Sequence, residues 1–347
     1  MAQKRSKDNQ KGSVAIKYDF SNIQWQGAEL DKLKGYLIEQ IDLISQYPER
    51  EAETLVRLLS RRLELTEKEL IVTDGATGAI HLVAGQYSGS VSLLLPPTNN
   101  EFYHALERTG HTIKLQEEIK ELSKLNLEGV DMLWLSNPNN PDGRFFSRRS
   151  LLTLLRENPN LTVVLDISLT NFVVEDNIRP VDIKKYPNLI LVSSFSHAYN
   201  IPGLRVGYLI ANADKIASFR TKYYPNGINT LALEACRYVL LHPAQFTIPV
   251  RKWLRNSLEL ADALDKLDGV SVLYGATPFF VLRLEEVKAA DLAKYLLEKH
   301  GIKVGTSESD IDLKDNEIRI SGFASERINE LLIEAVSEFL STLPSNQ

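Results

Sequence analysis

The chain has 347 residues, of which 44% are hydrophobic and 24% charged, as in a globular protein that buries a large core. A net charge of -5, without any cluster of Lys and Arg among aromatic residues, argues against nucleic acid as a partner. The single cysteine, Cys236, excludes an intramolecular disulfide and is typical of a reducing compartment. No apolar run reaches the length of a membrane span, and the N-terminal residues 1–13 are too polar for a signal peptide. We therefore expect a cytoplasmic protein with no membrane contact and a flexible tail at residues 1–18.

Short apolar runs alternate with helical patterns between residues 46 and 240. Several of these runs are rich in β-branched residues, as in strands buried on both faces. They comprise residues 70–73, 91–95, 112–115, 132–135, 162–165, 189–192 and 206–210. Between them, apolar residues recur at the spacing of a helix, as at Ile80, Val83, Ala84 and Tyr87. This alternation predicts an α/β fold whose mostly parallel sheet carries helices on both faces. We place this large domain at residues 46–240.

The last third of the chain has a different order of elements. A long helical pattern at residues 244–267 precedes strands at 270–274 and 279–284, and a helix at 289–299, a strand at 317–320 and a helix at 326–340 follow. This order is typical of a compact α+β unit. We expect residues 19–45 to pack onto it, so that the small domain comprises residues 19–45 and 241–347.

Polar residues follow four of the predicted strands, where ligands bind in open α/β sheets. The first group is the turn of Gly75, Ala76 and Thr77, whose backbone N–H groups at a helix start can hold a phosphate. A tight turn without a ligand is the simpler interpretation of this segment taken alone. The second group is the Asn-rich turn SNPNNPDG, which can present Asn140 to a ligand oxygen.

The third group is Asp166, directly after the run 161–165, where a poorly solvated carboxylate requires a cationic partner or a structural ion pair. The fourth is the segment SSFSHAYNIPGLRVGY, in which Ser194 and Arg205 flank a Pro-Gly turn and form a plausible phosphate clamp. His197 lies between them. A lone histidine is more often structural than catalytic, so the residues by themselves leave its role open.

The segment SSFSHAYNIPGLRVGY resembles the cofactor-lysine segment of class I/II aminotransferases, with His197 where that family has lysine. SNPNNPDG, VVLDIS and TDGATGAIHL resemble further motifs of the same family, in the same order. The resemblance implies a pyridoxal phosphate (PLP) enzyme of fold type I, with a seven-stranded mostly parallel sheet and a smaller α+β domain. It assigns the PLP phosphate to Ser194, Arg205, Gly75, Ala76 and Thr77, the phenolic oxygen to Asn140, and the pyridine nitrogen to Asp166.

Three more segments extend the resemblance. PPTNNEFYHAL is similar to the segment that stacks an aromatic ring on the cofactor, which would be Phe102, and QYP to the one whose tyrosine, here Tyr47, reaches the phosphate of a neighbouring subunit. IRI matches the arginine that binds the substrate carboxylate, here Arg319. The opening DFSNI looks most like histidinol-phosphate aminotransferases and threonine-phosphate decarboxylases and puts Asn22 beside the substrate. The resemblance thus implies a homodimer acting on a small amino-acid-like substrate.

Three departures from the family pattern bear on activity. The family lysine bonds covalently to PLP and then carries a proton, whereas imidazole lacks the primary amine for the first role and can still perform the second. Leu169 replaces a Tyr or Phe, which removes at most one hydrogen bond near the phenolic oxygen. Gly305 and Thr306 stand where close relatives often have an arginine for a substrate phosphate, which argues against a phosphorylated substrate.

Three hypotheses remain open at this point. The first is an enzyme, a transferase, dehydratase or lyase that uses non-covalent PLP or pyridoxamine phosphate (PMP), with His197 and Asp166 as its catalytic residues. The second is a degenerate relative that binds cofactor or ligand without turnover. The third is an ordinary aminotransferase in which His197 has been engineered. No spacing of residues indicates a metal site in any of them.

Overall fold

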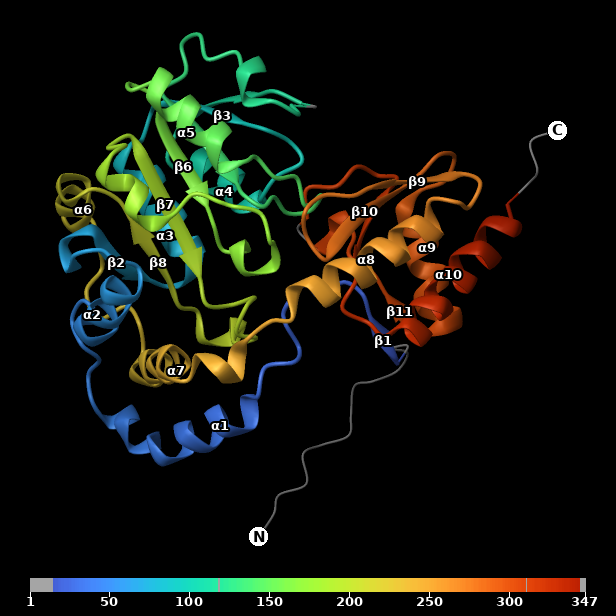
Figure 1. Cartoon of the computed structure of the whole chain (residues 1–347), viewed down its shortest axis with the longest axis horizontal. Coiled ribbons are helices and arrows are strands. Elements are labelled where there is room, and N and C mark those ends of the chain that lie inside the picture. The colour runs from blue at the N-terminus through green and yellow to red at the C-terminus, as the bar shows by residue number, and fades with distance from the viewer. Residues whose placement is uncertain (1–14, 118, 310, 344–347) are drawn as a thin grey trace.

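The computed structural model describes residues 15–117, 119–309 and 311–343, so most of the predicted N-terminal tail lies outside the described residues. A larger domain holds a central sheet between two layers of helices, and a smaller domain lies beside it at the end of helix α8 (Figure 1). None of the helices in the described ranges is both long enough and apolar enough to cross a membrane.

The large domain is built on a seven-stranded sheet with the order β2-β8-β7-β6-β5-β3-β4. Its strands are β2 (Leu70–Thr73), β3 (Val91–Leu94), β4 (Thr112–Leu115), β5 (Met132–Ser136), β6 (Thr162–Asp166), β7 (Leu189–Ser194) and β8 (Gly207–Ile210). The pairs among β3 to β7 are parallel, and β8 alone runs against its neighbours β7 and β2. The predicted seven-stranded, mostly parallel sheet is therefore confirmed.

Alternate residues of the central strands enter different cores, as the two-residue period of a strand requires. Leu133 and Leu135 face one core, whereas Met132 and Trp134 face the other. The first core contains residues of α2 (Glu53–Arg62), α5 (Arg148–Glu157) and α7 (Thr230–Leu241), and the second contains residues of α3 (Gly75–Gln86), α4 (Asn100–Arg108) and α6 (Ala213–Arg220). Because both faces are covered, the central strands are apolar on consecutive residues.

The small domain has its own core and two small sheets. Strands β9 (Val270–Leu273), β10 (Phe279–Leu284) and β12 (Glu317–Ser321) form an antiparallel sheet, and β1 (Tyr18–Asp19) pairs in parallel with β11 (Ile302–Lys303). Its helices are α8 (Val250–Leu264), α9 (Ala289–Tyr295), which continues as a π-helical turn (Leu296–His300), and α10 (Glu326–Ser341). Helix α8 begins later than the sequence pattern suggested, because Pro249 lacks an N–H donor and disfavours helix at the residue before it.

The N-terminal segment divides between the two domains. Strand β1 and Phe20 belong to the small domain, as expected. Helix α1 (Leu30–Glu39) instead packs against α7, and its Leu33 lies in a core of the large domain. The assignment of all of residues 19–45 to the small domain was therefore wrong for α1. The apolar residues of α1 are too few to reveal which of two cores they join.

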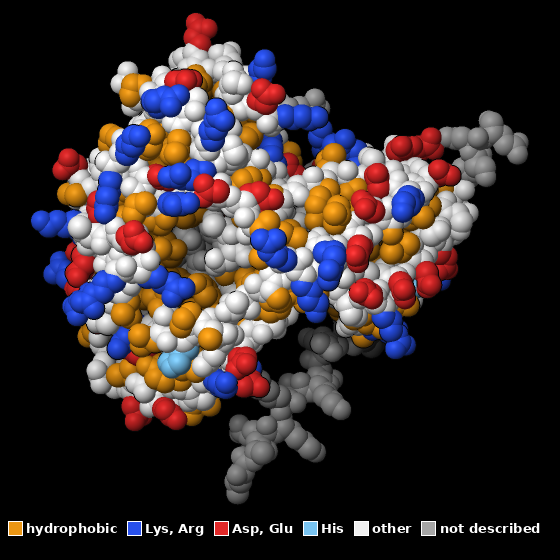
Figure 2. Space-filling view, in the orientation of Figure 1, with side chains coloured by type: hydrophobic (Ala, Val, Ile, Leu, Met, Phe, Trp, Pro, Cys, Tyr) orange, Lys and Arg blue, Asp and Glu red, His pale blue; other side chains and the backbone are white. Residues whose placement is uncertain are grey.

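Charged side chains of both signs are interspersed over both domains on the face shown in Figure 2. No region of this face carries basic side chains alone, which agrees with the net charge of -5.

Candidate active site

The candidate site lies at the carboxyl ends of β2, β5, β6 and β7, where the loops that follow these strands meet. Asp166 is the last residue of β6, and Ser194 the last of β7. Gly75 begins the helix after β2. Arg319 comes from β12 of the small domain, so the site is assembled from both domains.

The turn between β2 and α3 is shaped by glycines. Gly75 has φ +78°, and a Cβ there would lie 2.8 Å from Nη2 of Arg205. A Cβ on Gly207 of β8 would lie 2.3 Å from the carbonyl carbon of Gly75 and 2.6 Å from the backbone nitrogen of Ala76. The guanidinium group of Arg205 therefore lies against the first turn of α3. The guanidinium group of Arg205 and the N-terminus of α3 together present positive charge and N–H donors, which suits an anion such as phosphate.

Two serines lie near this turn at the end of β7. Ser194 Oγ donates to Ser196 Oγ at 2.8 Å and accepts the Ser196 N–H at 3.0 Å. Arg205 itself has a left-handed backbone, φ 53°, and donates from Nη1 to the Pro202 carbonyl at 3.2 Å. Ser196 was not singled out from the sequence, although it lies in the quoted SSFSH segment. Thr77 was expected to contact the phosphate, whereas its hydroxyl donates to Glu101 at 3.3 Å in this structure.

Asp166 is buried and held by donors. Its Oδ1 accepts the Ser168 N–H at 2.9 Å, and its Oδ2 accepts from Asn99 Nδ2 at 3.3 Å. Burial raises the pKa of the Asp166 carboxyl, and the hydrogen bonds from Ser168 and Asn99 act in the opposite direction. Asn99 was missed as a site residue because an asparagine before a helix is an ordinary capping signal, and it also caps α4 here.

Arg319 and Asn140 meet across the two domains. Arg319 Nη1 donates to Asn140 Oδ1 at 2.7 Å, and Nη2 donates to the Ser21 carbonyl at 2.7 Å. Its Nε is buried without a partner, and burial lowers the pKa of Arg319 to about 10 despite the opposing charge of Asp19. Asn22, beside Ser21, uses its side-chain oxygen to accept the Gln24 N–H at 2.8 Å. Two of the five guanidinium N–H groups are therefore used, and the Nε–H is among those that remain.

His197 is buried and lies close enough to Arg205 and Arg319 for their positive charges to affect its pKa. The pKa of His197 is lowered to about 4, mainly by burial and in addition by the charges of Arg319 and Arg205. Its Nδ1 is buried without a hydrogen-bond partner, while its backbone carbonyl accepts the Trp25 N–H at 2.9 Å. The imidazole is therefore neutral near neutral pH. A neutral ring with a free nitrogen can accept a proton or a hydrogen bond from a ligand.

The sequence-based role of Phe102 is wrong. Phe102 has no exposed surface and packs against Trp134 with ring centroids 5.6 Å apart. It occupies the third position of α4, which turns it toward the core between α4 and the sheet, so its ring offers no face to a cofactor. Leu169 is likewise buried, in a cluster with Phe172 and Trp25.

Two further expectations can be located in the structure. Tyr47 is 96% exposed, and its reach into a neighbouring subunit stays a prediction. Gly305 pairs with Arg319 through an isolated β-bridge, with hydrogen bonds of 3.0 Å and 2.8 Å in the two directions. Within the ranges the structure describes, no three His, Cys, Asp or Glu side chains gather into a possible metal site.

The seven-stranded sheet and the smaller domain are those of PLP-dependent transferases of fold type I, as the solved structures described below show. The sequence profile of the family described as aminotransferase class I and II matches residues 38–335, and the chain belongs to this family. It is an aminotransferase-like enzyme of that class.

Individual relatives agree with this membership. A structure of L-threonine-O-3-phosphate decarboxylase from Porphyromonas gingivalis has a TM-score of 0.90 and 39% identity, covering 93% of this chain and 99% of that one. Histidinol-phosphate aminotransferase from Methanocaldococcus jannaschii is 26% identical over 89% of this chain and 86% of its own length. Histidinol-phosphate aminotransferase from Sinorhizobium meliloti, solved in complex with pyridoxal-5'-phosphate, has the same fold, with a TM-score of 0.81 at 17% identity over 95% of this chain and 92% of that one.

Proposed function

We propose that this chain binds PLP or PMP without a covalent bond and acts on a small amino-acid-like substrate, with His197 in the position that the family gives to lysine. The observation that carries the proposal is the buried imidazole of His197, whose Nδ1 has no hydrogen-bond partner. An imidazole has no primary amine with which to hold PLP covalently, and it is a competent proton carrier.

The residues present fit such a cofactor. A phosphate would be held by Ser194, Ser196, Arg205 and the N–H groups at the start of α3, where the glycines at 75 and 207 leave no room for side chains. Asp166 would accept from the pyridine nitrogen, and its burial strengthens an interaction with a cation because little water competes. Asn140 would contact the phenolic oxygen. When bound, PLP or PMP supplies the electron sink for chemistry at the substrate's α-carbon.

Arg319 is the group we assign to the substrate carboxylate. Its buried Nε has no partner, and Asn140 and Ser21 hold the guanidinium plane through its other nitrogens. Burial is the main cause of the lowered pKa of His197, and the charges of Arg319 and Arg205 add to it. A carboxylate and a phosphate would together neutralise those two charges. We therefore expect His197 to become a stronger base when both anions are present, so that proton transfer is favoured in the loaded site.

The substrate itself is proposed to lack a phosphate. The relatives named above are a threonine-phosphate decarboxylase and histidinol-phosphate aminotransferases, whose names specify phosphorylated substrates. This chain has Gly305 and Thr306 at the position where the family resemblance implies a phosphate-binding arginine. Neither residue has a cationic side chain, and the backbone of Gly305 pairs with that of Arg319 in a β-bridge.

We further propose that the functional unit is a homodimer. Ile38, Ile41, Ile44 and Tyr47 recur every third residue and are 71%, 47%, 70% and 96% exposed, respectively. Large apolar side chains grouped in this way mark a contact surface. A second copy covering residues 38–47 would remove them from water and bring Tyr47 to the partner's phosphate site.

The experiment that tests the proposal is a titration of the purified protein with PLP, followed by absorbance. Borohydride treatment and denaturation should then leave no pyridoxyl group on the chain by mass spectrometry. An adduct on any lysine would refute non-covalent binding, and saturable binding that is lost in Arg205→Ala would support it.

A second measurement separates an enzyme from a binding protein. We expect the loaded wild-type protein to exchange the α-proton of an amino acid with deuterated water, as followed by NMR, and His197→Asn to lose this exchange while retaining PLP. Absence of exchange over a broad panel of amino acids would favour a binding protein without turnover. Loss of a hydroxyl or a carboxyl group from the substrate would identify the dehydratase or lyase alternative.

A further inference from the structure

The loop between β3 and α4, residues 95–99, connects the small domain to the buried carboxylate of the site. At one end of the connection, the Thr98 N–H donates to Asp312 Oδ2 of the small domain at 2.8 Å. At the other end, the next residue, Asn99, donates to Asp166 Oδ2. Two consecutive residues of one loop therefore bond to a small-domain carboxylate and to a site carboxylate.

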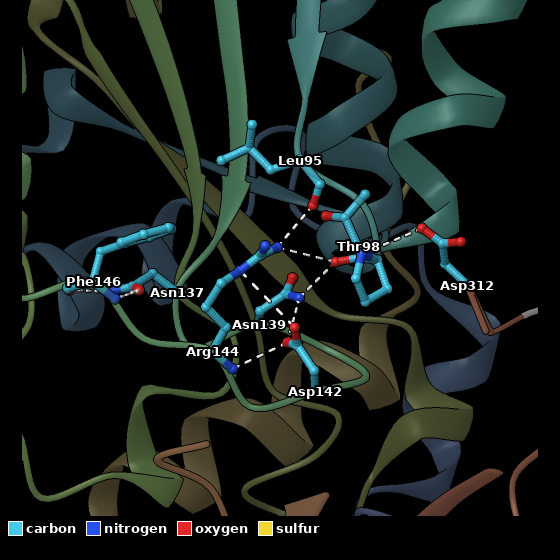
Figure 3. Close-up of polar contacts among 9 residues, drawn as sticks. Leu95, Thr98, Asn137, Asn139, Asp142, Arg144, Phe146 and Asp312 are labelled. Atoms are coloured by element: carbon cyan, nitrogen blue, oxygen red, sulfur yellow. Dashed lines mark hydrogen bonds and ion pairs between the residues drawn. The ribbon is translucent and has the colours of Figure 1, made fainter. Parts of the chain in front are cut away.

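The large domain holds the same loop from its opposite side. Arg144 Nη2 donates to the carbonyls of Leu95 and Pro97 at 2.7 Å and 3.1 Å, and Asn139 Nδ2 donates to the Pro97 carbonyl at 2.7 Å (Figure 3). Asn139 also donates to Asp142, whose Oδ1 accepts the Arg144 N–H at 3.0 Å. These contacts hold residues 95–97. Asn99 is also held by α4, because the Glu101 and Phe102 N–H groups donate to its Oδ1 and its carbonyl at 3.1 Å and 3.0 Å, so that Thr98 is the residue of this loop whose backbone is bonded to the small domain.

Asp312 stands at a junction between the domains. A cleft of about 1030 Å³ is lined by Pro97, Asp142 and Arg144 of the large domain and by Asp312 and Lys314 of the small domain, among others. In Figure 3, Asp312 approaches Thr98 from the side opposite Arg144. Tyr103 of α4 also donates to Asp312 Oδ2, at 3.4 Å. Asp312 thus receives bonds from the loop and from the helix that Asn99 caps.

We propose that Asp312 is a positioning residue for Asp166, acting through Thr98 and Asn99. In this arrangement the small domain, which supplies Arg319, also determines whether Asn99 stays within hydrogen-bond distance of Asp166. The significance for cofactor binding rests on the proposed function, because it gives Asp166 the pyridine nitrogen. The link itself is a property of the polypeptide and is measurable without PLP.

The test is the titration of the Asp166 carboxyl in the full-length protein without cofactor, by NMR of side-chain 13C-labelled aspartate. The Asp166 signal is identified by its absence in Asp166→Asn. Asn99→Ser retains a helix-capping side chain and removes the amide donor. We expect it to make Asp166 a roughly five-fold weaker acid, because a hydrogen bond to the ionised form is lost.

The Asp312 variants are designed to separate the link from the charge. Asp312→Asn keeps an oxygen acceptor for the Thr98 N–H, whereas Asp312→Ala and the polar Asp312→Ser do not reach it. We expect Ala and Ser to weaken Asp166 as an acid by roughly two- to three-fold relative to Asn. Combined with Asn99→Ser, they should add nothing further, because both changes remove the same contact. Asp315→Ala removes an exposed charge from the same segment and is the matched control.

The outcomes are separable. If Asp312→Ala, Asp312→Ser and Asp312→Asn give the same titration of Asp166, or if Asn99→Ser leaves it unchanged, the proposal is overturned. A loss of thermal stability without a shift in the titration would likewise assign these residues a structural role only. Failure of the protein to bind PLP would refute the proposed function and leave the titration result standing.

Discussion

Protonation of His197 should make the protein acid-sensitive in a way that one substitution removes. The pKa of His197 is about 4 in the folded protein, against 6.5 for an unperturbed histidine. The unfolded chain therefore binds a proton more readily than the folded protein does. The resulting stability is fully present above pH 6.5 and is lost as the pH falls from 6.5 towards about 4.

The size of the effect follows from these two values. The full difference corresponds to about 3.4 kcal/mol, at 1.36 kcal/mol per pKa unit. At about pH 5 the unfolded histidine is almost fully protonated and the folded one mostly neutral, so about 2 kcal/mol is already lost. At about pH 7.5 the contribution of protonation to the free energy of unfolding is close to zero.

The assay is reversible urea unfolding of wild type and His197→Asn at these two pH values. We expect the difference in free energy of unfolding between the two proteins to change by about 2 kcal/mol in favour of the variant as the pH is lowered. His242→Asn removes an exposed histidine and is the control. Inorganic phosphate should reduce the effect by neutralising Arg205. Equal pH dependence of wild type and His197→Asn would refute the argument that the imidazole is held neutral.

Three further predictions concern the site and its assembly. His197→Lys should yield a borohydride-stable pyridoxyl adduct and raise aminotransferase activity. An adduct without activity would show that other residues of the pocket no longer support transamination. Loss of an existing wild-type activity in this variant would show that His197 is the catalytic base. Gly75→Ala should weaken PLP binding by roughly ten-fold or more, because its backbone has φ +78° and the added Cβ would lie 2.8 Å from Arg205 Nη2, whereas unchanged affinity by absorbance titration would place the phosphate elsewhere. Tyr47→Phe should leave a dimer in light scattering yet weaken PLP binding roughly five-fold through one lost hydrogen bond, and a monomer with full affinity would contradict the shared site.

Most of the large domain could be predicted from local pattern, because strands buried on both faces are continuous apolar runs. The predicted runs 70–73 and 112–115 coincide with β2 and β4, and the other central strands differ by one or two residues at their ends. The structure places Asp166 and Ser194 at the carboxyl ends of β6 and β7, where the sequence pattern put them. The roles of Asp166, Ser194, Asn140, Arg205 and Arg319 toward a cofactor or substrate come from the family resemblance and stay predictions.

The directions of side chains and the contacts between residues far apart in the chain could not be predicted from the sequence. Phe102 lies in a correctly recognised segment, but the sequence does not say which face of α4 packs on the sheet, and the residue that reaches Asp166 is Asn99. The partners of Asp312 are more than 200 residues away in the chain. Nothing local to Asp312 distinguishes it from Asp315, which is exposed in the same segment.

By itself the sequence determined the fold class, the order of the sheet-forming segments and the presence of histidine at position 197, because these depend on residue type and spacing along the chain. The tertiary structure alone decided that the pKa of His197 is lowered, since this depends on burial and on Arg319 and Arg205 approaching it in space. It alone decided that α1 joins the large domain and that Arg319 meets Asn140 across the domain boundary. Electrostatic and packing energies depend on distance in space, and local sequence patterns carry no record of that distance.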